Sequence, residues 1–144
     1  MIVVADASVL VAELMRVRGR ALMDHPELDV LVAEEQWSET QYELDRRLRR
    51  IIERAHITVE QTALIRREVD ALIPDEAIKV VPRHVYEHVE AIARRRIPRD
   101  PNDWPTVALA LTLDAAILTH DNDFLGCGCA TWTVETLRGE LSQG

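Results

Sequence analysis

Short apolar runs alternate along the chain with longer segments in which apolar residues recur every three or four positions. The runs span only four or five residues and contain few polar positions, which is typical of strands covered on both faces in a parallel sheet. We predict five strands by this criterion: Ile2–Ala5, Val30–Ala33, Ile78–Val81, Ala116–Thr119 and Ala130–Val134. Since the last run is the least apolar, we expect a sheet of four or five strands.

The segments between these runs predict helices, because their apolar residues fall on one face at a period of 3.6. One helix is expected from Ser8, broken at Gly19, with a short second piece that ends near His25. Further helices are predicted at Glu35–Ala55, Thr58–Leu72, His84–Arg95, Asp103–Leu113 and in the tail from Glu135. This alternation of strand and helix predicts one α/β domain over residues 1–144, with a mainly parallel sheet.

Two of the predicted helices carry extra signals. Thr58 and Gln61 have the spacing of a capping box at a helix start. The segment Asp103–Leu113 is apolar nearly all round, and Pro105 suits its first turn. It is therefore expected to be the central buried helix.

Composition narrows the class of protein. With 144 residues, of which 47% are hydrophobic, the chain can bury a real core. Its net charge of −8 argues against a broad basic surface for nucleic acid, although a local basic patch or a metal-mediated site is compatible with it. Cys127 and Cys129 lie too close together to pair. No stretch has the length of a transmembrane helix, and no signal peptide is seen at the start, so we expect a cytoplasmic protein.

Acidic residues flank the most apolar part of the chain. Asp100 and Asp103 precede the run from 107 to 118, and Asp121 and Asp123 follow it. A buried segment does not require carboxylates at its ends. If folding brings several of them together, their repulsion has to be offset, and a bound cation is one way to do so.

The predicted topology places some of these acids at one edge of the sheet. Asp6 follows the first strand and Asp121 follows the fourth, and the carboxyl ends of parallel strands share an edge where sites form. Asp103 joins them only if a loop brings the start of its helix there. On spacing alone, Glu39 competes with Glu34 and Glu35 as a fourth acid. For any single aspartate, a role as a turn residue or helix cap is about equally reasonable.

Four stretches together resemble the PIN-domain nucleases: VVADASVL, EEQWSETQYEL, DPNDWPTVALAL and LTHDNDF. The resemblance spans nearly the whole chain, and within the family it is strongest to the bacterial group that includes the VapC-type toxins. It implies a three-layer α/β/α sandwich with a mainly parallel central sheet of four to five strands.

The resemblance also implies a set of site residues. The family's catalytic acids fall on Asp6, Glu39, Asp103 and Asp121. Its metal ligands fall on Asp6, Asp103, Asp121 and, as an accessory, Asp123. The small hydroxyl residues that support these acids fall on Ser8 and Thr119.

The function implied by the resemblance is cleavage of single-stranded or structured RNA by a water activated by Mg²⁺ or Mn²⁺. Oxygen ligands favour these hard cations over zinc. A role as the toxin of a toxin–antitoxin pair would add a cognate antitoxin as a partner. The alternative is a non-catalytic PIN fold that binds RNA or protein. Family habit further suggests a homodimer, which we expect to form through an apolar surface around Leu14, Met15, Leu48 and Ile52.

Two other enzyme or signalling classes gather acids at a sheet edge, and the sequence fits neither. A phosphoacceptor receiver domain needs a lysine after a late strand, but the only lysine, Lys79, precedes the fourth strand. A phosphatase of the haloacid-dehalogenase type needs a second aspartate two residues after the first, where this chain has Ser8.

Basic and histidine-containing motifs have more ordinary interpretations. The arginine clusters at 46–50 and 94–96 could line an RNA path, but a solvated helix face is the simpler interpretation for each arginine. His84 and His88 have the spacing of a helical metal pair without a third ligand nearby, so we expect them to have no metal role.

Overall fold

The computed structural model describes residues 1–54 and 56–143. Its centre is one sheet of five strands in the order β3-β2-β1-β4-β5, and every pair of neighbours is parallel. The strands are β1 (Ile2–Ala5), β2 (Asp29–Ala33), β3 (Ile78–Val81), β4 (Ala116–Leu118) and β5 (Thr131–Trp132). The apolar runs therefore located all five strands. The fifth is shorter than expected, because Val134 already begins the last helix.

Within residues 1–54 and 56–143, seven α-helices connect or follow these strands. They are α1 (Ala7–Leu14), α2 (Val17–Met23), α3 (Glu34–Glu53), α4 (Val59–Ala71), α5 (Glu90–Arg96), α6 (Trp104–Leu113) and α7 (Val134–Gln143). Four single 3-10 turns complete the described chain: η1 (Arg83–Val85), η2 (Glu87–Val89), η3 (Pro101–Asp103) and η4 (Asn122–Phe124). The predicted end of the long helix at Ala55 lies outside the described residues. The capping box at the start of α4 forms as predicted.

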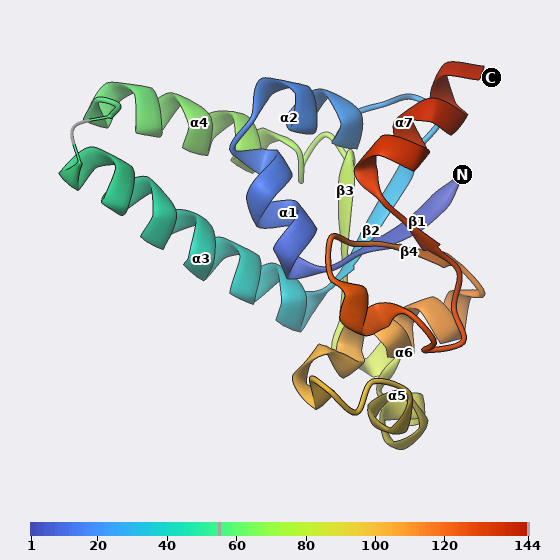
Figure 1. Cartoon of the computed structure of the whole chain (residues 1–144). Helices are drawn as coiled ribbons and strands as arrows, with labels where there is room; N and C mark the ends of the chain where they lie inside the picture. The colour runs from blue at the N-terminus through green and yellow to red at the C-terminus, as the bar shows by residue number, and fades with distance from the viewer. Residues whose placement is uncertain (55, 144) are drawn as a thin grey trace.

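The helices lie in two layers on the two faces of the sheet. One face of the sheet, with Val3 and Val30, packs against α1, α2, α3, α4 and α7. The other face, with Val4 and Ile117, packs against α5 and α6. Figure 1 shows the pair α3 and α4 reaching out to one side, while α5 and α6 lie together below the sheet. The chain thus forms the three-layer α/β/α sandwich expected from the sequence.

The helix α6 is the central buried helix that its composition predicted. All residues from Trp104 to Ala110 are buried. The segment from η1 to η3 links β3 to α6, and α6 then leads directly into β4. Because β3 and β4 are parallel, α6 has to run from the carboxyl edge of the sheet back to its amino edge. Its first residue therefore lies at the edge where Asp6 is found.

The prediction that Gly19 ends a helix was wrong. The break falls earlier, at Arg16, whose backbone is extended, and Gly19 lies inside α2. A Cβ atom at this position would lie 1.9 Å from the carbonyl oxygen of Glu13. The missing side chain thus serves the close approach of α2 to the end of α1, not the end of a helix.

The single helix predicted for His84–Arg95 was also wrong. The segment forms two 3-10 turns before α5 begins at Glu90. Tyr86 and Val89 leave the helical region, with φ of −120° and −109°. Tyr86 is fully buried and its ring packs on Trp104, with centroids 5.8 Å apart. Tertiary packing of one aromatic side chain has overridden the local helical pattern.

Among the described residues, no helix is both long enough and apolar enough to cross a membrane.

Candidate functional site: an acidic pocket at the carboxyl edge of the sheet

A cavity of about 240 Å³ opens at the carboxyl edge, next to the ends of β1 and β4. Its lining is dominated by acids and consists of Asp6, Ala7, Ser8, Val11, Glu39, Glu43, Arg47, Asp100, Asp103 and Asp121. All four of the acids that the sequence proposed as catalytic line it. They come from four separate places in the chain: the ends of β1 and β4, helix α3 and the turn before α6.

Asp6 is the most buried of these acids, with 2% of its surface exposed. One carboxylate oxygen accepts a hydrogen bond from the backbone N–H of Val9 at 3.0 Å, which caps α1. The Ser8 hydroxyl lies 2.9 Å from both oxygens, and the Thr119 hydroxyl donates to the second oxygen at 2.7 Å. The carboxylate is therefore held in one orientation by three donors at the rim of the pocket.

Thr119 joins Asp6 to Asp121. Besides donating to Asp6, its hydroxyl accepts the backbone N–H of Asp121 at 2.9 Å. Asp121 in turn caps η4, because its side chain accepts the N–H of Asp123 at 2.8 Å. Asp6 and Asp121 thus act as helix caps and line the pocket at the same time. The two interpretations of these aspartates are compatible.

Asp103 is positioned by a residue that sequence reasoning did not select. Gln36 is 2% exposed, and its side-chain amide donates to Asp103 at 3.5 Å while its carbonyl oxygen accepts the backbone N–H of Ala7 at 2.9 Å. It therefore ties the start of α1 to the start of α6. Gln36 shares the buried face of α3 with Thr40 and Leu44. A polar residue on that apolar face was the sequence signal that could have identified it.

The structure distinguishes Glu39 from its neighbours in sequence. Glu34 accepts the backbone N–H of Arg83 at 2.7 Å, and Glu35 pairs with the Arg83 guanidinium at 3.1 Å. Both are engaged away from the pocket, whereas Glu39 and Glu43, one turn apart on α3, line it.

Burial of the acids, and then their crowding, shows in their pKa values. Burial raises the pKa of Asp103 to about 7, and the negative charges of Asp100 and Asp6 add to the rise. Burial and then Asp100 raise the pKa of Glu39. Burial also raises the pKa of Asp6, although the hydrogen bonds from Val9, Thr119 and Ser8 oppose the rise. The pocket gathers six acids and one arginine, Arg47, so a cation would be attracted to it.

Sequence comparison adds the decisive observation, since residues 4–142 match a family model described as PIN domain. The chain belongs to the PIN-domain family. PIN domains are generally nucleases, so the acidic pocket lies on a nuclease fold. The crystal structure of PAE2754 from Pyrobaculum aerophilum is similar to this PIN domain, with a TM-score of 0.66 and 20% identity over 100% of both chains. At that identity the likeness supports the fold alone. No curated protein gives a significant match.

PIN domains typically bind divalent metal ions, and the pocket suits such an ion in the kind of ligand it offers. Carboxylate oxygens are the donors that Mg²⁺ and Mn²⁺ prefer, and burial together with the neighbouring charges of Asp100 and Asp6 raises the pKa of Asp103. Over residues 1–54 and 56–143, however, no three His, Cys, Asp or Glu side chains are arranged so that they could hold one ion. Binding of an ion would therefore need these side chains to move.

The structure does not bring Asp123 to the acidic pocket, although it was proposed as an accessory ligand. Asp123 lines a neighbouring cavity and lies 3.7 Å from the Arg99 guanidinium. Conversely, Asp100, Glu43 and Arg47 line the acidic pocket without having been selected from the sequence. Asp123 lies outside the acidic pocket because the 3-10 turn η4 directs the residues after Asp121 away from it.

His84 and His88 of this PIN domain are exposed and lie in different 3-10 turns. Their helical i, i+4 relationship is therefore lost. Trp104 packs in the core, as expected for a tryptophan, with the guanidinium groups of Arg83 and Arg94 5.1 and 5.4 Å from the centre of its ring.

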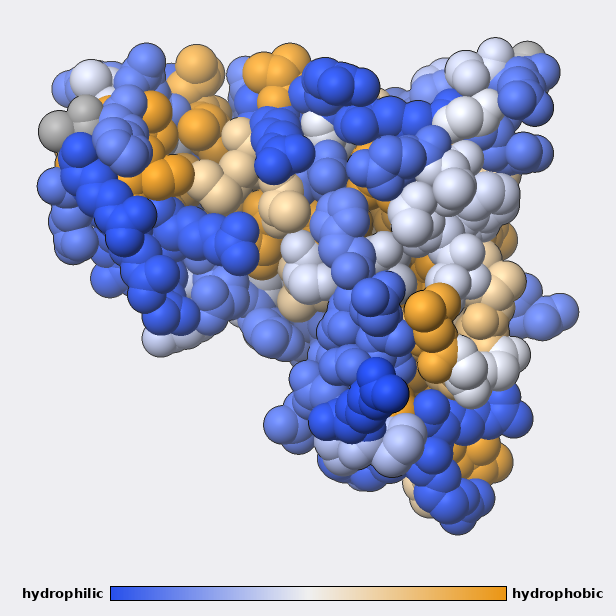
Figure 2. Space-filling view, in the orientation of Figure 1, coloured by the Kyte–Doolittle hydropathy of each residue, from blue (hydrophilic) through white to orange (hydrophobic). Residues whose placement is uncertain are grey.

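The apolar surface predicted for a dimer is not available as proposed. Leu14 is fully buried and Leu48 is 5% exposed, because both belong to the core under α1 and α3. Met15 and Ile52 are half-buried. Figure 2 shows apolar side chains gathered between α3 and α4, while the outer side of α3 is hydrophilic. A homodimer stays a prediction, but Leu14 and Leu48 are too buried to contribute to its surface.

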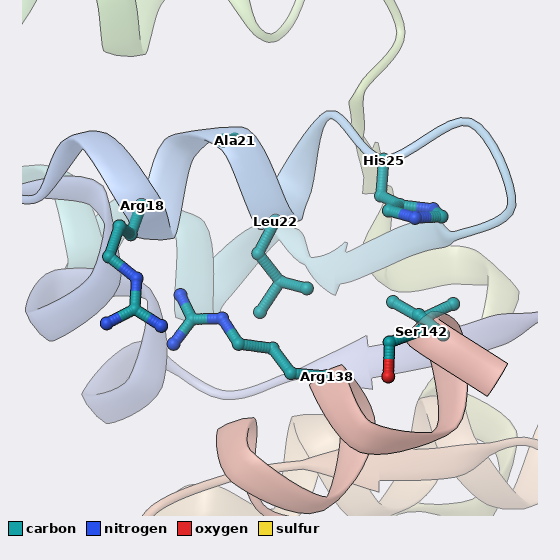
Figure 3. A pocket seen from close by; sticks show the side chains of 7 residues that line it. Arg18, Ala21, Leu22, His25, Arg138 and Ser142 are labelled. Carbon is teal, nitrogen blue, oxygen red and sulfur yellow. The ribbon is translucent and has the colours of Figure 1, made fainter.

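A separate cavity of about 350 Å³ lies between α2 and α7 and shares no lining residue with the acidic pocket. Arg18 and Arg138 point toward one another at one end of it, and His25 and Ser142 lie at the other (Figure 3). Its chemistry is basic and apolar, so it is not part of the acidic site.

Proposed function

We propose that this PIN domain is a Mg²⁺- or Mn²⁺-dependent endoribonuclease whose catalytic centre is the acidic pocket. The observation that supports this most strongly is the convergence of Asp6, Glu39, Asp103 and Asp121 on one cavity at the carboxyl edge of the sheet. Acids that served only as caps and turns would have no reason to share a pocket, and burial raises the pKa of three of them, Asp6, Glu39 and Asp103.

The residues of the pocket have separable roles in this proposal. Asp6, Asp103 and Asp121 would hold the ion, and Glu39, which also lines the pocket and is exposed, would act as the base for an attacking water. When bound, the divalent ion supplies an activated water and charge neutralisation for hydrolysis of a phosphodiester bond. Gln36 and Thr119 would act on the ligands, because they fix the orientation of Asp103 and Asp6.

The pKa of Asp103 couples ion binding to pH. A carboxyl group with a pKa of about 7 is half-protonated at neutral pH, and a cation has to displace that proton before it binds. We therefore expect ion affinity and cleavage to increase as the pH rises through 7.

The proposal is tested by cleavage of a fluorescent single-stranded RNA with Mg²⁺ or Mn²⁺ and with chelator. Wild type should cleave only with the ion. The cleavage rate should fall roughly 100-fold or more in Asp6→Asn and in Asp103→Asn, because each change keeps the size of the side chain but removes its charge. His84→Ala is the control and should cleave as wild type. Folded variants that retain full activity would contradict the proposal, and a folded wild type without any cleavage would favour a non-catalytic binding module.

We further propose that the nuclease is the toxin of a toxin–antitoxin pair and acts as a homodimer. Expression of wild type should then arrest growth, expression of Asp6→Asn should not, and a co-expressed antitoxin that covers the acidic pocket should relieve the arrest. Light scattering that shows a monomer at micromolar concentration would argue against the dimer.

A further inference from the structure

A second cavity lies directly beside the acidic pocket and has the opposite character. Its volume is about 480 Å³, and it is lined by Arg96, Pro98, Arg99, Asn122, Asp123, Leu125 and Gly126. The two linings share no residue but adjoin at two points of the chain, since Arg99 is followed by Asp100 and Asn122 is preceded by Asp121, and those two acids line the acidic pocket. An anionic group in the second cavity would therefore lie next to anything bound at the acids.

The guanidinium of Arg99 is available for such a group. Its side chain is 79% exposed, and its ion pair with Asp123 is long, at 3.7 Å. Exposed ion pairs of this kind contribute little to stability, so the guanidinium can readily exchange the carboxylate for another anion. A phosphate group, two of whose oxygens can accept hydrogen bonds from one guanidinium in a bidentate manner, is a better partner than a distant carboxylate.

Arg96 is held at the same cavity by the loop that follows η4. Its guanidinium donates to the carbonyl oxygen of Cys127 at 3.3 Å. Gly128 makes this contact possible, because a Cβ there would lie 2.5 Å from the Arg96 guanidinium. Within the same arginine cluster, Arg94 has a different role: it pairs with Glu90 at 3.0 Å and covers the Trp104 ring.

A third arginine stands at the α3 side of the acidic pocket. In the other arginine cluster, Arg46 pairs with Glu43 at 3.3 Å, whereas Arg47 lines the pocket itself. Cations thus border the acids on two sides, with Arg47 on α3 and the pair Arg96 and Arg99 beyond the turn before α6. The arrangement matches a chain of phosphates with one phosphate at the acids and others beside it.

We propose that a single-stranded polynucleotide crosses the acidic pocket between Arg47 and the second cavity, where Arg96 and Arg99 bind the phosphate next to the one at the acids. The cavity is large enough for one nucleotide. Leu125, which is 65% exposed, and Pro98 supply apolar surface for its base. This path rests on the proposed function for the identity of the group at the acids, but its phosphate contacts can be measured without cleavage.

The test is binding of a fluorescent single-stranded RNA to Asp6→Asn protein by anisotropy at several salt concentrations, with Arg99→Gln added to the same background. Loss of one phosphate contact should raise Kd about five-fold or more at low salt and make the salt dependence of log Kd shallower by roughly 0.7. Arg99→Lys should recover part of the affinity. Arg18→Gln is the matched control, because Arg18 also lines a cavity, but the one between α2 and α7.

The outcomes separate the path from the catalytic proposal. Unchanged Kd and salt dependence in Arg99→Gln, or an equal loss in Arg18→Gln, would overturn the path even if wild type cleaves RNA. A selective loss in Arg99→Gln would support the path even if no cleavage is found and the catalytic proposal fails. If wild type does cleave, Arg99→Gln in the otherwise native chain should raise KM more than it lowers kcat.

Discussion

The Thr119 hydroxyl donates a hydrogen bond of 2.7 Å to Asp6, and so joins two residues that are 113 positions apart in the chain. Asp6 follows β1 and Thr119 follows β4, and these two strands are neighbours in the sheet. The same hydroxyl accepts the N–H of Asp121. One buried oxygen atom thus sets the distance between two of the proposed metal-binding acids.

Replacement of Thr119 by valine should therefore destabilise the protein and disturb the site. The variant keeps the shape but leaves Asp6 without one donor and Asp121 N–H without its acceptor, which we expect to lower the free energy of unfolding by about 1–2 kcal/mol. Thr119→Ser retains the hydroxyl and should recover most of the loss. Urea denaturation of the three proteins measures both effects, and equal midpoints for valine and serine would show that the hydroxyl is unimportant.

The raised pKa of Asp103 predicts how stability depends on pH without divalent ions. Its pKa is about 7 in the folded chain against 3.8 for an ordinary aspartate, so the folded state holds the proton more tightly. The contribution of this proton to the free energy of unfolding is fully present below about pH 4 and is lost as the pH rises through 7. Asp103→Asn should flatten the fall in stability over this range, although the raised pKa values of Asp6 and Glu39 leave part of it. Urea denaturation between pH 4 and 8 tests this, and parallel curves for both proteins would contradict it.

Replacing two glycines inside helices, Gly19 and Gly139, by alanine should change the stability of the protein in opposite directions. Gly19→Ala places a methyl group against the carbonyl of Glu13 and should cost about 2–3 kcal/mol, because neither helix can move without disturbing the core. Gly139 in α7 faces open space, so Gly139→Ala should stabilise the protein by about 0.5–1 kcal/mol. Thermal melting distinguishes them. A stable Gly19→Ala protein would mean that α1 and α2 can separate at little cost.

Much of the fold could be predicted because its signals are local. The short apolar runs located every strand, and the unbroken apolar character around Val107 identified α6 as the buried helix. What failed depended on contacts between distant residues. The sequence does not show that Gly19 lies against Glu13, or that burial of Tyr86 interrupts a helical pattern.

The candidate site divides in the same way. Asp6 and Asp121 follow strands, so topology alone placed them at one edge of the sheet. The choice of Glu39 over Glu35 depended on Arg83, which lies far along the chain and engages Glu35 instead. Gln36 escaped notice because its role requires two partners, Ala7 and Asp103, that only the folded chain brings to it.

The most direct test of the central claim, that the acids of this pocket hold a divalent ion, is thermal melting with and without Mn²⁺. The Tm of wild type should rise by roughly 5–10 °C at a Mn²⁺ concentration about 100-fold above the Kd of the ion. Asp103→Asn should gain less than wild type, because one ligand of the ion is lost. Asp123→Asn is the control and should gain as much as wild type, since Asp123 lines the neighbouring cavity. Equal stabilisation of wild type and Asp103→Asn, or no stabilisation of wild type, would contradict the claim.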